Sequence, residues 1–170
     1  MTTDRPLHVL FLCVGNSARS IMAESILNHL AGDRFIGVSA GSQPAGAVHP
    51  EALRLLTEKG HNVSRLRSKS WDDYAGADTP PIDFVVTVCD HAAAETCPIW
   101  PGHPMVAHWG VADPASVDGP GASQKQAFAD AYDLLQKRIT SFVSLPLAEL
   151  SPSEQRAAMD RIGHLRSSRG

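Results

Sequence analysis

The most constraining feature of this chain is an eight-residue segment, residues 13–20, which reads Cys-Val-Gly-Asn-Ser-Ala-Arg-Ser. It follows an apolar-rich run, residues 8–12, and precedes an amphipathic stretch, residues 21–30, so this order predicts a strand, a loop and a helix. Successive backbone N–H groups of such a loop, the positive end of the helix and the guanidinium of Arg19 can face one small anion. The anion would then lie on the thiol of Cys13.

Cys13 is the predicted nucleophile of this loop. The opening helix favours its thiolate, and the hydroxyl of Ser20 can donate a hydrogen bond to the sulfur. A positive φ is useful at Gly15 and Asn16, which both tolerate it. The predicted oxyanion-binding residues are Val14, Gly15, Asn16, Ser17, Ala18 and Arg19. A cysteine six positions before an arginine is a weak pattern by itself, and a structural cysteine buried at a strand end remains the alternative.

Composition limits what the chain can do. Its 170 residues are 43% hydrophobic, which is enough for one core and too little for two ordinary domains. A net charge of −3 and a pI of about 6.2 give no basic surface for nucleic acid. No apolar run has membrane-spanning length, and the first residues lack the build of a signal peptide, so we expect a cytoplasmic protein without a membrane partner. In that reducing compartment, three cysteines favour catalysis over a structural disulfide framework.

Strand-like and helix-like segments alternate along the chain. Short β-branched runs separated by helices are typical of an α/β fold, a parallel sheet with helices on both faces. The predicted strands are 7–12, 35–40, 84–88 and 105–108, and the predicted helices are 19–31, 49–59 and 123–144. We expect residues 1–145 to form one catalytic domain. The Gly-, Pro- and Ser-rich segments 41–48 and 113–122 lie at strand ends, where loops of an active site are expected.

The helices carry apolar stripes that predict a core. In the first helix the expected stripe is Met22, Ile26 and Leu30, and in the second it is Leu53 and Leu56, with Gly60 ending that helix.

Residues 146–170 form a C-terminal extension that we expect to contain one helix. Ser151 and Glu154 make a capping box at its start, and Ala158, Met159 and Ile162 form a thin apolar stripe. The extension is either solvated or docked. We expect a monomer, with a dimer contact through this extension as the alternative.

Through the loop at residues 13–20, the chain resembles the low-molecular-weight protein tyrosine phosphatase superfamily, whose loop reads Cys, five residues, Arg, and then Ser or Thr. The resemblance covers most of residues 7–143. It implies a three-layer fold with a four-stranded parallel sheet in the order 2-1-3-4, and it places Cys13 at the carboxyl ends of the strands. Two branches share this loop, namely phosphotyrosine phosphatases and arsenate reductases, so the remaining cysteines have to distinguish them.

Cys89 and Cys97 favour the reductase branch. Cys89 directly follows the third strand, and if that strand neighbours the first, the two strand ends lie about 5 Å apart, within disulfide reach of Cys13. As one helix, the eight residues to Cys97 would span about 12 Å, so a bond between Cys89 and Cys97 requires this segment to unwind. The geometry suggests a disulfide relay, and the segment through Cys97-Pro98 looks like the redox segment of the thioredoxin-coupled arsenate reductases.

Other interpretations of these cysteines remain. They could be two core thiols, or they could hold zinc together with His91 and His103, although seven intervening residues are not a usual structural-zinc spacing. The expectation is that the protein has no metal and no tightly bound cofactor.

The segment from His108 to Pro114 resembles the His-Trp-Gly segment of the reductases that leads to a catalytic Asp-Pro. Asp113 is the general acid that this resemblance implies, held protonated in a dry, anion-filled pocket. The alternative for Asp113 is a simple turn residue before proline. Tyrosine phosphatases of this fold carry an aromatic residue after Asp-Pro to stack the phenyl ring, whereas this chain has Ala115.

The resemblance therefore implies an arsenate reductase for arsenic detoxification. Arsenate would bind the loop with phosphate or sulfate as competitors, and Cys13, Cys89 and Cys97 would pass a disulfide outward to thioredoxin, with glutaredoxin and glutathione as the second choice. A low-molecular-weight phosphatase is the alternative, and residual phosphatase activity fits both. A module that only senses the anion is disfavoured because both the nucleophile and the acid are present.

Some reductases of this family carry a potassium site beside the loop, and the matching positions here include Asn16, Glu24 and Ser39. Lys69 falls where a carboxylate ligand would be. We expect its ammonium to replace the metal ion.

Overall fold

The computed structural model describes residues 6–75, 81–88, 104–117 and 121–165. The strands and helices occur in the order that the sequence predicts, with bounds that differ by at most two residues. The strands are β1 (Leu7–Cys13), β2 (Phe35–Gly41), β3 (Phe84–Thr87) and β4 (Met105–His108). The helices are α1 (Arg19–Ala31), α2 (Pro50–Glu58), α4 (Gly121–Val143) and α5 (Pro152–Gly163), with the short 3₁₀ helices η1 (Trp71–Tyr74), η2 (Pro114–Ser116) and η3 (Leu147–Glu149).

The sheet has four parallel strands in the order β2-β1-β3-β4, which confirms the expected topology. Its register aligns the carboxyl ends of the strands. Cys13 pairs with Gly41 on β2, Leu12 pairs with Thr87 on β3, and Thr87 pairs with His108 on β4. Beyond the strands, the Val88 N–H donates to the Leu12 carbonyl at 2.9 Å. The loop after β1 and the segment after β4 therefore begin at the same edge of the sheet.

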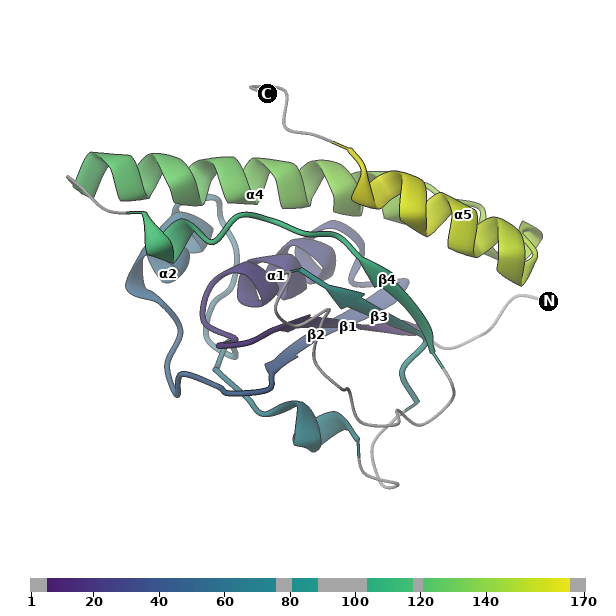
Figure 1. The fold of residues 1–170 in the computed structure, drawn as a ribbon, viewed down its shortest axis with the longest axis horizontal. Coiled ribbons are helices and arrows are strands. Elements are labelled where there is room, and N and C mark those ends of the chain that lie inside the picture. Colours follow the sequence, from purple (N-terminus) through teal and green to yellow (C-terminus); the bar gives the residue numbers. More distant parts are fainter. Residues whose placement is uncertain (1–5, 76–80, 89–103, 118–120, 166–170) are drawn as a thin grey trace.

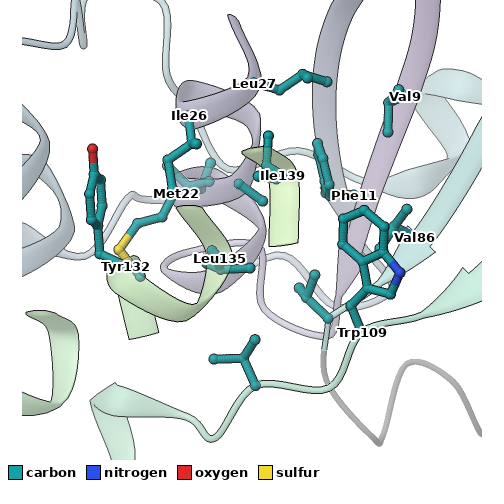
Figure 2. Packing of buried hydrophobic residues seen from close by; sticks show 14 of the residues in the cluster. Val9, Phe11, Met22, Ile26, Leu27, Val86, Trp109, Tyr132, Leu135 and Ile139 are labelled. Atoms are coloured by element: carbon teal, nitrogen blue, oxygen red, sulfur yellow. The ribbon is translucent and has the colours of Figure 1, made fainter. Parts of the chain in front are cut away.

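Helices α1, α2, α4 and α5 gather on one face of the sheet, and α4 crosses that whole face in Figure 1. Most of the core lies between them and the sheet. Figure 2 shows this packing, in which the side chains of α1 and α4 meet those of β1 and β3 and the ring of Trp109. Trp109 is fully buried, and its ring lies 5.9 Å from that of Phe142 and 6.5 Å from that of Phe11.

The opposite face of the sheet carries a smaller cluster of Leu10, Leu12, Ala40, Ile82 and Val85. Within the described residues, the segment around η1 covers it, and this short helix lies on the far side of the sheet from α4 in Figure 1. Both faces of the central strand β1 are thus buried, which explains its nearly continuous apolar sequence.

One expected core position is wrong. Met22 and Ile26 are buried in α1, but Leu30 is 43% exposed, and Leu27 is fully buried instead. Because α1 lies between the sheet and α4, it is buried over more of its circumference than the single stripe that the sequence suggested. In α2, Leu56 is buried as expected while Leu53 is only half-buried, and Gly60 follows this helix with a φ of +87°.

A buried polar triad joins three parts of this helical layer. His61 Nδ1 lies 2.7 Å from Ser25 Oγ of α1, and His61 Nε2 lies 2.8 Å from Tyr132 OH of α4. Burial lowers the pKa of His61, and the stacked ring of His29, 4.2 Å away, lowers it further. Because both ring nitrogens have partners, the triad holds α4 against α1 in one alignment.

Helix α5 of the C-terminal extension is docked on the domain. Ser151 and Glu154 form the predicted capping box, and Ala158, Met159 and Ile162 are buried against the core. Helix α5 lies along β4, where the Arg156 guanidinium reaches the Val106 carbonyl at 3.4 Å. This placement packs α5 against the outermost of the described strands.

In the part of the chain that the structure describes, no helix combines the length and the apolar character needed to cross a bilayer.

Replacing Met159 by Ala tests whether α5 belongs to the core. Met159 is fully buried, so we expect its truncation to lower the free energy of unfolding by about 2 to 5 kcal/mol, measured by urea denaturation. Leu30→Ala is the control, because this exposed side chain should cost less than about 1 kcal/mol. Equal costs for the two variants would mean that α5 contributes no more than a surface contact.

Candidate active site

The segment between Cys13 and Arg19 forms a closed loop from the end of β1 to the start of α1. Its carbonyl groups are held on the outside by the chain that follows β2. Gln43 N–H donates to Val14 O at 2.9 Å, Ala45 N–H to Gly15 O at 2.8 Å, and His49 N–H to Ser17 O at 2.8 Å. These donors belong to the Gly- and Pro-rich segment 41–48 and to the adjacent His49. The sequence predicts that segment 41–48 is a loop of the active site.

The outward carbonyls fix where the N–H groups point. In a trans peptide the C=O and the following N–H are opposed, so the N–H groups of Gly15, Asn16 and Ala18 point away from segment 41–49, toward the inside of the loop. Ala18 is the N-cap of α1 and makes no side-chain capping bond. The first N–H groups of α1 therefore remain available to the same interior, and the loop is built to hold an anion.

Asn16 carries the strained conformation of the loop. Its φ is +46°, as expected, whereas Gly15 does not use a positive φ, so that expectation is wrong. The reason is the Asn16 side chain, which is fully buried and bonded at both ends. Its Oδ1 accepts from Lys69 N–H at 2.7 Å, and its Nδ2 donates to Ser20 Oγ at 2.8 Å. An asparagine amide can hold the left-handed conformation by such bonds, which a glycine lacks.

The sulfur of Cys13 receives two hydrogen-bonding groups. Asn16 N–H donates to Sγ at 3.2 Å, and Ser20 Oγ lies 2.9 Å from it. Because Ser20 Oγ accepts from the Asn16 amide, its own hydrogen is free to point at the sulfur. Cys13 is only 4% exposed, so these two groups lie beside a sulfur that is almost fully buried.

Gly41 shows how tightly β2 supports this loop. A Cβ on Gly41 would collide with the Val14 carbonyl and would lie 2.9 Å from the Cys13 carbonyl. The residue paired with Cys13 must therefore be glycine, which lets the loop lie directly against the end of β2.

Arg19 closes the loop and reaches the segment after β4. Its Nη1 donates to the Val111 carbonyl at 2.9 Å, and its Nη2 lies 3.7 Å from Asp113 Oδ2. The Arg19 side chain is 16% exposed and that of Asp113 is 40% exposed. The predicted anion-binding arginine and the predicted acid thus lie together, although 94 positions separate them in the sequence.

Asp113 caps the short helix η2. Its Oδ1 accepts from Ala115 N–H at 3.0 Å, with Pro114 in the first helical position. Before it, the Trp109 N–H donates to Thr87 O at 2.8 Å and the Val111 N–H to Val88 O at 2.9 Å, which extends the strand pairing toward the acid. His108 Nδ1 lies 2.7 Å from Thr87 Oγ1. These contacts tie His108 and Trp109 to β3.

The predicted relay residues Cys89 and Cys97 lie outside the described residues, as do His91 and His103 of the zinc alternative. Among the residues that are described, no group of three His, Cys, Asp or Glu side chains could hold a metal ion.

Behind the loop lies a buried ion pair. Lys69 Nζ is 3.6 Å from Glu24 Oε1 and donates to the Arg67 carbonyl at 2.8 Å, and Ser39 Oγ donates to the same Glu24 oxygen. Burial raises the pKa of Glu24 and lowers the pKa of Lys69, while each charge opposes the shift of the other. The ammonium of Lys69 thus contacts Glu24, whose carboxylate also accepts from Ser39, and Glu24 and Ser39 are two of the positions where the resemblance implied a potassium site.

Replacing Ser20 by Ala tests the donor to the sulfur. In a Cys89→Ser/Cys97→Ser background, so that only Cys13 is labelled, we expect iodoacetamide to alkylate Cys13 about tenfold more slowly at neutral pH, because a hydrogen bond to a charged group is lost. Ser25→Ala is the matched control on the same helix, since Ser25 bonds to His61. An unchanged rate for Ser20→Ala would mean that this hydroxyl does not stabilise the thiolate.

Replacing Lys69 by Met tests the buried pair. Glu24 would be left charged and unpaired at 12% side-chain exposure, so we expect a loss of about 3 kcal/mol in the free energy of unfolding, partly recovered by adding Glu24→Gln. Arg54→Met, which breaks an exposed ion pair, is the control and should cause no measurable change. The melting temperature of the native chain should be equal in KCl and NaCl. A steep rise with potassium would contradict the role of the Lys69 ammonium.

Comparison with known proteins agrees with this geometry. The family model of the low molecular weight phosphotyrosine protein phosphatases matches residues 8–156. An arsenate reductase of Halalkalibacterium halodurans is 37% identical over 134 residues, covering 79% of this chain and 93% of the relative. The structure of the thioredoxin-dependent arsenate reductase of Corynebacterium glutamicum superposes with a TM-score of 0.62 at 26% identity, over 87% of this chain and 66% of that one.

A low molecular weight protein tyrosine phosphatase of T. tengcongensis has a similar structure, with a TM-score of 0.58 and 25% identity over 79% of this chain and 98% of that one. Solved structures named for both activities therefore share the fold of this chain. The fold, the match of the family model over most of its length and the loop around Cys13 make this chain a member of the low molecular weight phosphotyrosine protein phosphatase family.

Proposed function

We propose that this protein is an arsenate reductase. The observation that carries the proposal is the Cys13 sulfur, buried under two hydrogen-bond donors at the base of a loop whose N–H groups and arginine converge. Two further observations favour a reductase over the other enzymes that share this loop. The sequence contains Cys89 two residues after the end of β3 and Cys97 beyond it, and the curated relatives of 33–38% identity carry the name arsenate reductase.

Arsenate is the substrate that this loop suits. A tetrahedral oxyanion would accept from the N–H groups that line the interior and from a bidentate Arg19 guanidinium. Phosphate and sulfate have the same shape and similar charge, so they should compete. The net charge of the chain is −3, so attraction of the anion has to come from this local arrangement.

The first step joins sulfur to arsenic. The Cys13 thiolate attacks arsenic, a Cys13 S–As bond forms, and one As–O bond breaks. Asp113 protonates the departing oxygen, which leaves as water. Arsenic is still pentavalent at this stage, so no electrons have been transferred.

The second step transfers two electrons. The Cys89 thiolate attacks the sulfur of Cys13, an S–S bond forms, and the S–As bond breaks with its electron pair on arsenic. Arsenite leaves with trivalent arsenic, and two thiols have become the Cys13–Cys89 disulfide. The Cys97 thiolate then attacks Cys89, which frees Cys13 and leaves a Cys89–Cys97 disulfide.

An external dithiol has to reduce that last disulfide. We propose thioredoxin, because the structural neighbour from C. glutamicum is named as thioredoxin-dependent, with glutaredoxin and glutathione as the second choice. No tightly bound cofactor is needed for these steps. The same proposal assigns the chain to the cytoplasm as a monomer that serves arsenic detoxification.

A phosphatase is the second candidate, since the same loop, Arg19 and Asp113 would hydrolyse a phosphomonoester. The family and the T. tengcongensis neighbour favour it. Against it, Ala115 follows Pro114 where a stacking aromatic side chain is expected for phosphotyrosine. We therefore propose phosphatase activity only as a residual property.

Coupled turnover separates the two functions. With arsenate, thioredoxin, thioredoxin reductase and NADPH, we expect native protein to consume NADPH, and Cys13→Ser, Cys89→Ser and Cys97→Ser each to abolish this consumption. Single turnover without thioredoxin then orders the thiols. Native protein and Cys97→Ser should each release about one arsenite per chain, whereas Cys13→Ser and Cys89→Ser should release none, because two thiols supply the electron pair.

The same measurements can also show that the protein is a phosphatase. If native protein consumes no NADPH with arsenate yet hydrolyses aryl phosphates, it is a phosphatase. That hydrolysis would then require Cys13 and Asp113 but neither Cys89 nor Cys97. Release of arsenite by Cys89→Ser in single turnover would exclude the proposed second step.

A further inference from the structure

Arg138 is a buried arginine in the apolar face of α4. It is 5% exposed and lies in the same row as Ala131, Leu135, Ile139 and Phe142, all of which are buried core residues. Burial lowers the pKa of its guanidinium. An arginine rarely occupies such a position unless its N–H groups are satisfied, so its partners indicate what it does there.

Those partners are backbone carbonyls of two separate segments. Arg138 Nη1 donates to Gly110 O at 2.9 Å, and Nη2 and Nε donate to Leu165 O at 2.9 and 3.3 Å. Gly110 belongs to the segment that leads from β4 to Asp113, and Leu165 follows the last turn of α5. One guanidinium thus joins the C-terminal part of α4, the end of α5 and the segment that carries the acid.

Val111, the next residue of that segment, is bonded to the anion-binding loop. Val111 O accepts from Arg19 Nη1 at 2.9 Å, and Arg19 also faces Asp113. The carbonyls of two consecutive residues are therefore fixed by two arginines, one from the anion-binding loop and one from α4. Because Val111 N–H is bonded to Val88 O, both peptides that precede Ala112 have defined orientations.

Helix α5 supports the beginning of the same segment. Trp109 Nε1 donates to Met159 O at 3.0 Å, and a Cβ on Gly163 would lie 2.6 Å from His108 O. The end of α5 is therefore packed directly on His108 and Trp109. Leu165 lies two residues after Gly163, and its carbonyl accepts from Arg138. The packing of Gly163 on His108 and the hydrogen bond from Arg138 to Gly110 therefore depend on each other.

We propose that Arg138, together with the docked end of α5, is a positioning residue for the acid. It sets the backbone of Gly110 and Val111 so that the Asp113 carboxyl faces Arg19 and the anion on Cys13. This inference rests on the proposed function in one respect, the role of Asp113 as general acid. It also gives the C-terminal extension a part in catalysis.

The test is a double-mutant cycle between Arg138→Met and Asp113→Asn. Methionine keeps an unbranched apolar stem in the core and removes every donor. We measure the single-turnover rate of arsenite release at saturating arsenate and, for the same four proteins, the hydrolysis of p-nitrophenyl phosphate. We expect Arg138→Met to slow both reactions about 10- to 100-fold when Asp113 is present and to have no further effect in the Asp113→Asn background.

Two readouts separate positioning from general damage. The first is the rate at which iodoacetamide alkylates Cys13, and the second is the protection of Cys13 from alkylation by phosphate. Both report on the anion-binding loop and are measured in a background where Cys89 and Cys97 are Ser. We expect both to be unchanged in Arg138→Met. Arg156→Met is the matched control, since Arg156 also joins α5 to β4 but contacts Val106 rather than the acid segment. We expect it to keep the native rate of both reactions.

Arg138→Lys covers the case in which Arg138→Met does not fold. A lysine can reach one carbonyl but not fork to two, so we expect an intermediate loss that again disappears in the Asp113→Asn background.

Any one of the following results in the Arg138 and Arg156 variants would overturn the inference. They are an equal loss of rate with and without the Asp113 carboxyl, a loss of Cys13 alkylation in parallel with activity, and an equal loss in Arg156→Met. Failure of the proposed function is distinguishable, because native protein would then release no arsenite while the cycle on p-nitrophenyl phosphate still measures the coupling of Arg138 to Asp113. If Asp113→Asn slows neither reaction, there is no acid to position and the inference is wrong.

Discussion

The orientation of a few peptide groups between Cys13 and Arg19 is the constraint on which the rest of this structure depends. Their N–H groups point inward only because segment 41–49 binds the carbonyls of Val14, Gly15 and Ser17 from outside. Asn16 supplies the one left-handed turn, and its amide also orders the hydroxyl of Ser20 toward the sulfur. The loop is therefore preorganised by neutral hydrogen bonds before any anion arrives, which is the condition for strong electrostatic stabilisation.

Polar contacts to backbone carbonyls also connect this loop to the periphery. Arg19 holds Val111, Arg138 holds Gly110 and Leu165, and Trp109 bonds to Met159 of α5. Each contact is buried or half-buried, where a lost partner is costly, so the elements cannot shift independently. The sheet supplies the frame for this arrangement, because all four strands end at the same edge.

Local patterns predicted the elements well and individual side chains less well. The apolar runs gave the four strands, and capping signals such as Ser151 with Glu154 gave the start of α5. Leu30 was expected in the core and is exposed, because the sides of α1 that are buried depend on where α4 crosses it. Gly15 was expected to have a positive φ, but the buried amide of Asn16 carries the turn. Arg138 was missed, although a charged residue in an apolar helical row was a visible signal.

The sequence by itself determined the α/β alternation, and it predicted Cys13 and Arg19 as the candidate nucleophile and anion-binding residue and Asp113 as the candidate acid. Each of these depends on residues that are close together in the chain. Only the tertiary structure decided that Arg19 meets Asp113 across 94 positions, that Lys69 lies against Glu24, and that the C-terminal extension packs on the acid segment. These contacts join residues that are far apart in the chain, and local periodicity carries no information about which distant groups will meet. They are set by the order of the strands and by the packing of α4 and α5 against them.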